Sequence, residues 1–406
     1  MRLIAGHGRA AALAVGALLA MAAPASAFTV NTAGDPADAT PADGACDASC
    51  TLRSAINASN TTAADDTIGF ASGMTIVLSA DLPQVTDAVT IDGYSAPGSA
   101  ANTGAGFSAF NAIVNVNVEG SGHRIFDVTA NDVTIRGVRI YDSSRDGVLV
   151  EGGAARAHIE GNYIGEDAAG TDTKSNIGAG VAVFDASAAV IGGTTAAQRN
   201  LISGNGESGN FNPNFVPYGV YVRGNATDTL VQGNLIGTDA TGKVADPNGG
   251  AGVRVGGYTN GDNPVPTAAK DTVVGGFVSG AGNVISGNGV APLNAEGVFV
   301  GAEAGSGIAI AGNRIGTDVT GTAPVPNNYD GVELLTDARV HVGADDTGSG
   351  GNLISGNTVA GLRISSPNHV VVGNKIGTDV TGTVALPNGQ QGIYDNGNSS
   401  NLIGGT

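Results

Sequence analysis

The sequence has 406 residues, with 18 Lys and Arg against 36 Asp and Glu, and its formal net charge is −18. This acidic balance argues against nucleic-acid binding, which depends on Lys and Arg side chains that meet phosphates. It argues equally against unaided binding of a polyanionic sugar. The 66 glycines recur among Val and Ile residues, which is typical of an ordered repeat rather than of a disordered chain.

Residues 1–27 are predicted to be a secretory signal peptide. Arg2 and Arg9 form a basic start, an apolar run follows, and the segment ends in the small-residue pattern Ala-Ser-Ala at 25–27. Phe28 would then begin the mature chain. No later stretch has the roughly 18–20 apolar residues of a membrane-spanning helix. We therefore expect a secreted or cell-surface protein without a membrane span.

The segment 28–67 is predicted to cap the first end of the fold. Within CTLRSAINASN at 50–60, Thr51 is a suitable N-cap, and Leu52 and Ile56 lie on one face of a helix. Because a stack of strands exposes unpaired backbone groups at its end, such a helix is expected to cover them.

Two cysteines follow the predicted signal peptide. Cys46 and Cys50 are expected to form a local disulfide after export, with two free thiols as the alternative. A metal site is disfavoured, because nothing nearby supplies a second pair of soft ligands.

Three short phrases recur along the rest of the chain, and the commonest is Gly-apolar-x-apolar. Its copies begin at residues 147, 180, 219, 252, 297, 331, 361 and 392. The other two are an apolar run that ends in glycine and Asn-x-Ile-Gly/Ser. One unit is about 22 residues plus a variable loop, and it contains three short alternating segments, each suited to a strand.

Three short strands cannot bury their apolar faces alone, whereas stacked copies can. The repeat therefore predicts an all-β solenoid, a parallel β-helix of about ten turns over residues 68–406. The chain stops at NLIGGT in the middle of a turn, so we expect it to be a fragment of a longer protein.

The start of the chain resembles a known family. The stretch Cys-Thr-Leu-Arg-Ser-Ala-Ile at 50–56, with its surroundings over 28–93, is similar to the CSLREA-type N-terminal domain of large secreted bacterial β-helix proteins. Ser54 stands where that family usually has Glu. The remainder resembles the right-handed parallel β-helix repeats of the pectate-lyase-like superfamily. The resemblance implies export and a surface or extracellular role, and it implies no particular reaction.

One sixteen-residue phrase, such as GNRIGTDVTGTAPVPN, occurs four times, at 161–176, 233–248, 312–327 and 373–388. Each copy has an acidic residue at one fixed place, namely Asp167, Asp239, Asp318 and Asp379. The copies are two turns apart, which places these residues about 10 Å from one another along one edge.

Three interpretations of these aspartates are open. They could form a row of Ca²⁺ sites, with hydroxyl and carbonyl oxygens as further ligands; no other cofactor is expected. Catalysis is disfavoured, because equivalent acids in repeated surroundings offer no division of roles. The favoured interpretation is structural, with each Asp capping a turn through backbone N–H groups.

The asparagines of the Asn-x-Ile phrases are expected to form a structural ladder along the axis, because stacked amides can bond one another. They are Asn162, Asn200, Asn234, Asn283, Asn313, Asn352 and Asn374. His341 and His369 fall in similar phrases and are expected to stack on adjacent turns. The densest charged cluster is interpreted as surface ion pairs; it comprises Arg136, Arg139, Asp142, Arg145 and Asp146.

Two long insertions, at 206–219 and 257–271, are the best places for specific binding. The first brings together Phe211, Phe215 and Tyr218. Such a cluster would suit sugar recognition through ring faces, and plain packing of the loop is the favoured alternative.

Two functions follow as hypotheses. The favoured one is a structural, adhesive or glycan-binding module of a larger envelope protein, with an extracellular glycan or a cell-surface component as partner. The alternative is a polysaccharide lyase or glycoside hydrolase on the same scaffold, because this architecture is compatible with both. A groove with clustered acids and a basic residue would favour the alternative.

Overall fold

The computed structural model describes residues 27–36, 45–46, 48–62, 64–167, 174–206, 217–257, 268–290, 295–396 and 400–404. The predicted signal peptide, apart from residue 27, therefore lies outside the described residues. Phe211 and Phe215 lie outside them as well.

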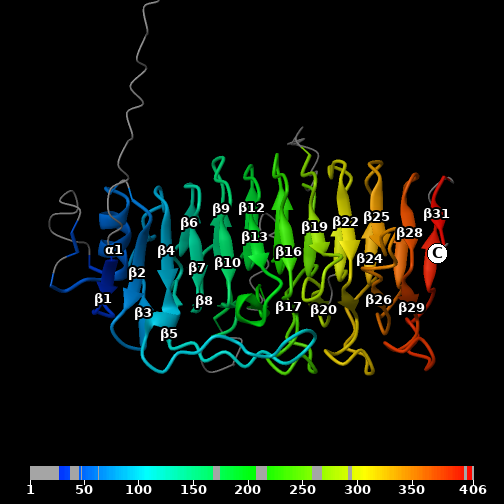
Figure 1. Ribbon diagram of the computed structural model, residues 1–406, viewed down its shortest axis with the longest axis horizontal. Coiled ribbons are helices and arrows are strands. Elements are labelled where there is room, and N and C mark those ends of the chain that lie inside the picture. Colours follow the sequence, from blue (N-terminus) through cyan, green and yellow to red (C-terminus); the bar gives the residue numbers. More distant parts are fainter. Residues whose placement is uncertain are drawn as a thin grey trace, which may run out of the picture.

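The described chain forms three long parallel sheets, which run side by side along one axis (Figure 1). Sheet A has 12 strands: β1 (Ala27–Val30), β2 (Asp66–Phe70), β4 (Val89–Asp92), β7 (Thr134–Arg136), β10 (His158–Glu160), β13 (Val190–Gly192), β16 (Leu230–Gln232), β19 (Val273–Gly275), β22 (Ile308–Ala311), β25 (Val340–Gly343), β28 (Val370–Val372) and β31 (Leu402–Ile403).

Sheet B has 10 strands: β3 (Met74–Val77), β5 (Val116–Glu119), β8 (Val138–Tyr141), β11 (Tyr163–Ile164), β14 (Leu201–Ile202), β17 (Leu235–Ile236), β20 (Val284–Ile285), β23 (Arg314–Ile315), β26 (Leu353–Ile354) and β29 (Lys375–Ile376). Sheet C has nine: β6 (Phe126–Val128), β9 (Val148–Val150), β12 (Val181–Phe184), β15 (Val220–Arg223), β18 (Val253–Val255), β21 (Val298–Val300), β24 (Val332–Leu334), β27 (Leu362–Ile364) and β30 (Ile393–Asp395).

From β4 onward the chain visits sheets A, B and C in turn and then returns to sheet A one rung further along. Every strand pair is parallel, and residues of equivalent phrases lie in register, as in the row Ile159, Ile191 and Val231. This arrangement is a right-handed parallel β-helix, as the sequence predicts.

The core lies inside the coil. Alternate strand residues point inward, because successive side chains of a strand face opposite sides. In β24, Val332 and Leu334 are fully buried while Glu333 between them faces out. The inward residues of successive turns form one continuous apolar cluster that extends from Phe28 to Val371.

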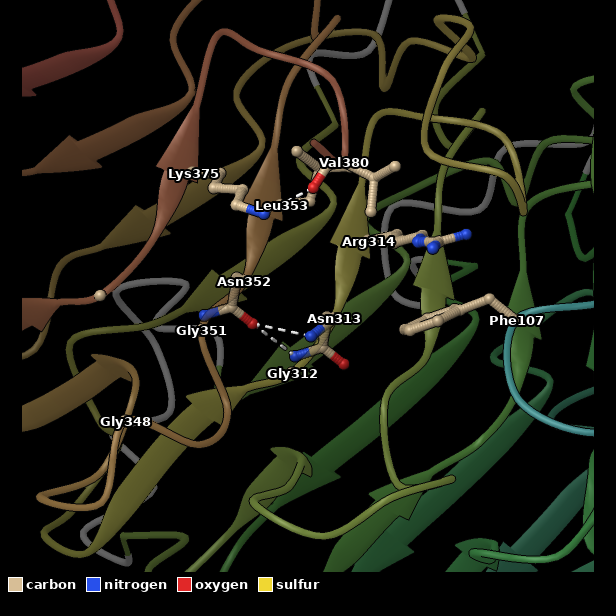
Figure 2. Close-up of a pocket in the computed structure, with 11 residues that line it drawn as sticks. Phe107, Gly312, Asn313, Arg314, Gly348, Gly351, Asn352, Leu353, Lys375 and Val380 are labelled. Atoms are coloured by element: carbon tan, nitrogen blue, oxygen red, sulfur yellow. Dashed lines mark hydrogen bonds between the residues drawn. The ribbon is translucent and has the colours of Figure 1, made fainter. Parts of the chain in front are cut away.

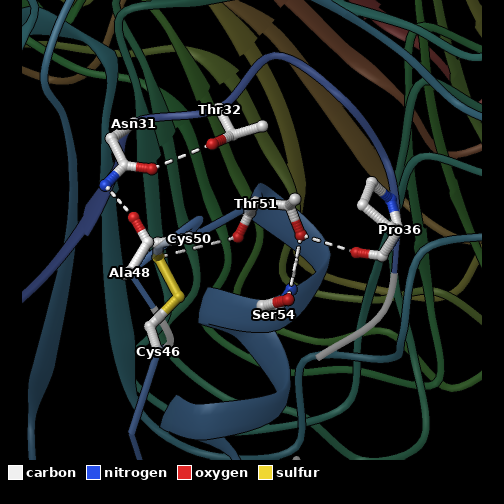
Figure 3. Close-up of a disulfide and its surroundings, with 8 residues drawn as sticks. All are labelled: Asn31, Thr32, Pro36, Cys46, Ala48, Cys50, Thr51 and Ser54. Atoms are coloured by element: carbon white, nitrogen blue, oxygen red, sulfur yellow. Dashed lines mark hydrogen bonds between the residues drawn. A yellow bond between two sulfur atoms is a disulfide. The ribbon is translucent and has the colours of Figure 1, made fainter. Parts of the chain in front are cut away.

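The first end of the coil carries the helix α1 (Leu52–Ser59), which packs on β1 and β2. The Thr51 side chain accepts a hydrogen bond from the backbone N–H of Ser54, so Thr51 is the N-cap. Cys46 and Cys50 form a disulfide just before the helix (Figure 3). Two short 3₁₀ turns, η2 (Gly93–Ser95) and η3 (Ala196–Gln198), complete the helical structure among the described residues.

Two asparagine ladders run along the coil. In the first, each amide bonds the next turn, as when Asn283 Nδ2 donates to Asn313 Oδ1 at 2.9 Å. Its members are the seven asparagines of the Asn-x-Ile phrases. The second ladder was not predicted from the sequence, and it is formed by Asn176, Asn205, Asn248, Asn288, Asn327, Asn357 and Asn388.

Three of the sixteen-residue phrases form projecting arms, and residues 168–173 of the first copy lie outside the described residues. In these three copies an antiparallel bridge closes the arm, between residues 238 and 245, 317 and 324, and 378 and 385. The arms contact one another across two turns: Val319 N donates to Gly242 O, and Val380 N donates to Gly321 O, each at 2.9 Å. The phrase recurs because every second turn contributes one arm to this row.

A long segment, residues 96–115, leaves η2 and runs along the outside of sheet B before it enters β5. It is the cyan segment that crosses several turns in Figure 1. We call it the strap. Asn102 Nδ2 donates to Ala196 O at 2.9 Å, and Phe110 N donates to Ala240 O at 2.7 Å. The strap was not predicted, because its sequence contains no repeat phrase.

Candidate functional site on the outer face of sheet C

The four repeated aspartates do not converge on one site. Asp239, Asp318 and Asp379 each accept hydrogen bonds from a threonine and from backbone N–H groups of their own arm. These bonds lower the pKa of Asp318 and Asp379 against the opposing effect of burial. The fourth, Asp167, is buried, and its backbone carbonyl accepts a bond from Arg139.

These contacts favour the structural interpretation of Asp239, Asp318 and Asp379, since each of these carboxylates is already engaged by its own turn. Within the described ranges, no group of three or more His, Cys, Asp or Glu side chains has an arrangement that would hold a metal ion. The calcium row stays a prediction, because the hydroxyl and backbone carbonyl oxygens that it would use lie outside that set of side chains.

The charged cluster of residues 136–146 is divided among the sheets. Arg136 pairs with Asp92 on sheet A at 2.9 Å. Arg139 lies over the Tyr163 ring on sheet B, 4.0 Å from its centroid. Asp146 is half-buried beside sheet C, where it accepts a bond from Ala179 N at 2.7 Å. These residues do not form one site.

The expectation that the two histidines stack is wrong. His341 lies opposite Val370 on the next turn, so His369 is one residue out of register with it. His369 is fully buried and its Nδ1 accepts a bond from Val340 N. His341 instead lies beside Phe277, with ring centroids 6.0 Å apart.

A different set of side chains is brought together on the outer face of sheet C. They occupy the variable position of the Gly-apolar-x-apolar phrase, which points outward on every rung. In register along the sheet they are Leu149, Ala182, Tyr221, Arg254, Phe299, Glu333, Arg363 and Tyr394. The residue before the phrase's glycine forms a second row, which includes Tyr218, Glu296 and Asp330.

At the centre of these rows lies a pair of carboxyl groups, Glu296 and Glu333, within hydrogen-bonding reach of each other. Glu296 is only 8 % exposed. Burial, reinforced by the neighbouring Glu333, raises the pKa of Glu296 to about 8. Burial also raises the pKa of Glu333. The pair therefore retains a proton at neutral pH, because two adjacent carboxylates cannot both ionise at low cost.

Arg363 and Asp330 hold one side of this pair. Arg363 Nε donates to Asp330 Oδ2 at 2.5 Å and lies 3.9 Å from Glu333 Oε1. The Asp330 side chain is fully buried and also accepts a bond from Ala360 N. The guanidinium thus fixes the position of Glu333 and opposes the rise in its pKa.

Aromatic rings and a second guanidinium hold the other side. Arg254 lies 4.4 Å from the Phe299 ring centroid and 5.3 Å from that of Tyr218. The Tyr218 and Tyr221 rings meet edge to face at 4.9 Å. Burial raises the pKa of Tyr218 to about 12. Tyr218 is thus the one residue of the predicted aromatic loop cluster that the described chain places in this site.

This arrangement provides the parts of an acid–base site. A protonated carboxyl group donates a hydrogen bond, an adjacent carboxylate accepts a proton, and cations lie on both sides. The sequence already contained a signal, because the variable position of the phrase gathers aromatic, basic and acidic residues from 221 to 394. In the prediction from sequence, this phrase indicated only the positions of strands, and the side chains at its variable position were not compared.

The sequence matches no protein-family model and no curated protein. Among solved structures, it is similar to the A-module of the mannuronan C-5 epimerase AlgE4 of Azotobacter vinelandii, with 13 % identity over 94 % of this chain and 89 % of that chain, and a TM-score of 0.48.

Two further solved structures are similar to this chain to a comparable, low degree. A double mutant of the periplasmic alginate epimerase AlgG has 10 % identity over 84 % of this chain and 70 % of that one, with a TM-score of 0.44. An alginate lyase from Paenibacillus sp. str. FPU-7 has 14 % identity over 94 % and 98 %, with a TM-score of 0.35. Likenesses this remote carry no argument about activity. Among the described residues, no helix is long and apolar enough to cross a membrane.

Proposed function

We propose that the protein is a polysaccharide-processing enzyme whose active site is the outer face of sheet C. The observation that carries this proposal is the buried carboxyl pair, Glu296 and Glu333, with the pKa of Glu296 raised to about 8. A carboxyl group that stays protonated at neutral pH is suited to act as a general acid or as a hydrogen-bond donor to a developing oxyanion.

The spacing of the pair favours a lyase over a hydrolase. Glycoside hydrolases separate their two carboxyl groups by about 5–10 Å, to leave room for water or for a covalent intermediate. Glu296 and Glu333 instead lie within hydrogen-bonding reach of each other. A shared proton fits β-elimination, in which a base and an acid act on neighbouring atoms of one sugar.

In the proposed reaction, Glu333 takes the proton from the carbon next to a uronate carboxylate. The electron pair then forms a carbon–carbon double bond, and the glycosidic carbon–oxygen bond breaks. Glu296 gives its proton to the departing oxygen, so the pair as a whole keeps one proton. Arg254 lies beside the rings that would support the sugar. This local cation favours a substrate that carries carboxylates, in spite of the acidic balance of the whole chain.

A second function is favoured by the rings of Tyr221, Phe299 and Tyr394, which share this face at intervals along the axis. Such rings can hold sugar faces without any turnover, so the same surface also suits a glycan-binding module. In both cases we propose an extracellular or cell-surface location, since the protein would reach its polysaccharide there.

The distinguishing experiment is a degradation screen of the purified protein on acidic and neutral polysaccharides, with added Ca²⁺ or with EDTA. Two quantities are followed together. The first is the ultraviolet absorbance of unsaturated uronate products, and the second is the yield of reducing ends. We expect unsaturated products from an acidic polysaccharide. Reducing ends without unsaturation would replace the lyase with a hydrolase. Binding without any product would replace the enzyme with a binding module.

A further inference from the structure

The outer face of sheet B has its own row of residues, and the strap covers only part of it. Tyr163, Leu201, Leu235 and Val284 are apolar rungs that pack with strap residues such as Phe110 in one cluster. The next rungs are Arg314, Leu353 and Lys375. The row therefore changes from apolar to basic at the point where Phe107 of the strap lies.

A hollow of about 290 Å³ opens at this point (Figure 2). Phe107 and Arg314 line one side and Lys375 and Val380 the other. Glycines form much of the rest of the lining. A side chain at nearby Gly282 would place its Cβ 2.8 Å from Phe107 Cζ, so the absence of a side chain there is what allows the ring to lie beside Arg314.

Arg314 is held by a ring and not by an acceptor. Its guanidinium carbon lies 4.1 Å from the Phe107 ring centroid. No described residue accepts a hydrogen bond from its side chain, although burial lowers its pKa. The nearby Asp318 carboxylate opposes that shift, but it is engaged by Thr320 and by backbone N–H groups of its own arm.

Arg314 is half-buried, and none of its nitrogens is among the fully buried polar atoms without a partner, so its N–H groups stay open to the hollow. An anion in the hollow would accept hydrogen bonds from them, and a carboxylate matches the fork geometry of arginine. The Phe107 ring beside it offers an apolar surface of the kind that a sugar ring covers.

Lys375 provides the second positive charge. Its Nζ donates to Val380 O at 2.5 Å, which leaves two of its three donors available. Arg314 and Lys375 are two rungs apart, or about 10 Å along the axis. Two cations at this separation suit a chain that carries several carboxylates better than they suit one small anion.

We propose that this hollow, between Phe107, Arg314 and Lys375, binds a carboxylate-bearing sugar unit of an acidic oligosaccharide. The site lies on sheet B and is separate from the carboxyl pair on sheet C. The choice of a sugar as the carrier of the carboxylate rests on the proposed function, whereas the anion site itself does not. Such a site would hold a long substrate on the coil beyond the reacting unit.

The test is calorimetric titration of the protein with an oligogalacturonate and with its carboxyl-reduced, neutral counterpart. The Glu296→Gln variant is included to remove turnover. We expect the acidic probe to bind and the neutral probe to bind at least tenfold more weakly. Arg314→Gln should weaken binding of the acidic probe by roughly 10- to 100-fold, and Lys375→Gln by less. Arg339→Gln removes an equal charge from an exposed position just before β25 and should change nothing.

Three outcomes would overturn the proposal. Equal affinity for the two probes would remove the carboxylate as the recognised group. Unchanged affinity in Arg314→Gln, with its melting temperature intact, would place the anion elsewhere. Equal competition by sodium acetate would show a general anion site and not a sugar site. If Arg314→Gln is unstable, Phe107→Leu tests the same hollow, because it removes only the ring. Binding without turnover would contradict the proposed enzymatic function, and it would remain consistent with this binding site.

Discussion

Titration of Glu296 is expected to change the stability of the folded state. Its pKa is about 8 in the fold against an ordinary value of 4.5. A carboxyl group with a raised pKa favours folding when it is protonated, and it loses that contribution as the pH rises between these two values. We expect the free energy of unfolding to fall by about 1–3 kcal/mol from pH 5 to pH 8.5.

Denaturant unfolding at several pH values measures this fall. Because the whole chain is acidic, other carboxylates add their own repulsion at high pH. The comparison is therefore with Glu296→Gln, which cannot ionise at this position. The variant should show a distinctly shallower dependence on pH than the wild type. Identical slopes for the two proteins would mean that Glu296 is ionised at neutral pH.

Asn283 is the residue that tests the asparagine ladder. It is fully buried, donates to Val231 O and to Asn313, and accepts two bonds from Asn234. Replacement by Ala leaves several buried polar groups without partners, so we expect a loss of about 2–4 kcal/mol of unfolding free energy. Asn225→Ala, at an exposed asparagine, should cost less than about 0.5 kcal/mol. Equal costs would show that the ladder is incidental.

The contacts between arms depend on a glycine at each crossing. Gly242 has φ +66°, and a Cβ there would lie 2.0 Å from Val319 Cγ1 of the next arm. Gly153 has a similar φ of +85° with no atom within 4 Å of such a Cβ. Gly153→Ala should therefore cost about 1–2 kcal/mol, from the backbone alone.

Gly242→Ala should cost about 1–3 kcal/mol more than Gly153→Ala, because overpacking adds to the same backbone term. Thermal or denaturant unfolding of both variants gives the comparison. If Gly242→Ala costs no more than its control, the arms do not support one another across turns.

The strap is anchored by Arg199, which is 4 % exposed. It donates to Ser108 O at 2.8 Å and to Gly106 O on the strap, and to Gly233 O on the coil at 2.9 Å. In Arg199→Met these carbonyls lose their donor, so we expect the strap to open locally. Hydrogen exchange of residues 102–112 should then quicken at least tenfold while sheet A is unchanged. Unchanged exchange in the strap would show that its apolar contacts alone hold it.

At the scale of the whole molecule, the repeat determines the coil. Phrases at regular spacing place Ile and Val of successive turns in register, and no other stacking buries them all. The strand order could therefore be predicted from the sequence. The strap could not, since Phe110 and Ala240 are brought together only after the turns have stacked.

The candidate site, like the fold, could be predicted only in part from the sequence. Glu296 and Glu333 are 37 positions apart and stand at different positions of the repeat phrase, so only the pitch of the coil reveals that they meet. The repeated aspartates occupy the same position in each copy of the phrase, and such equivalence in a solenoid indicates a structural role. The informative positions are those where the repeat changes from turn to turn, such as Tyr221, Arg254 and Glu333.

The proposed catalytic role of the carboxyl pair is tested by the rate of polysaccharide degradation by three proteins: the wild type, Glu296→Gln and Glu303→Gln. Glu303 lies in the turn after β21, apart from the carboxyl pair, and makes a matched control. We predict that Glu296→Gln lowers kcat by roughly 10²- to 10⁴-fold, with its fold intact by circular dichroism, while Glu303→Gln retains the wild-type rate. Full activity in Glu296→Gln would contradict the proposed catalytic role of the carboxyl pair and would show that the reaction takes place away from sheet C.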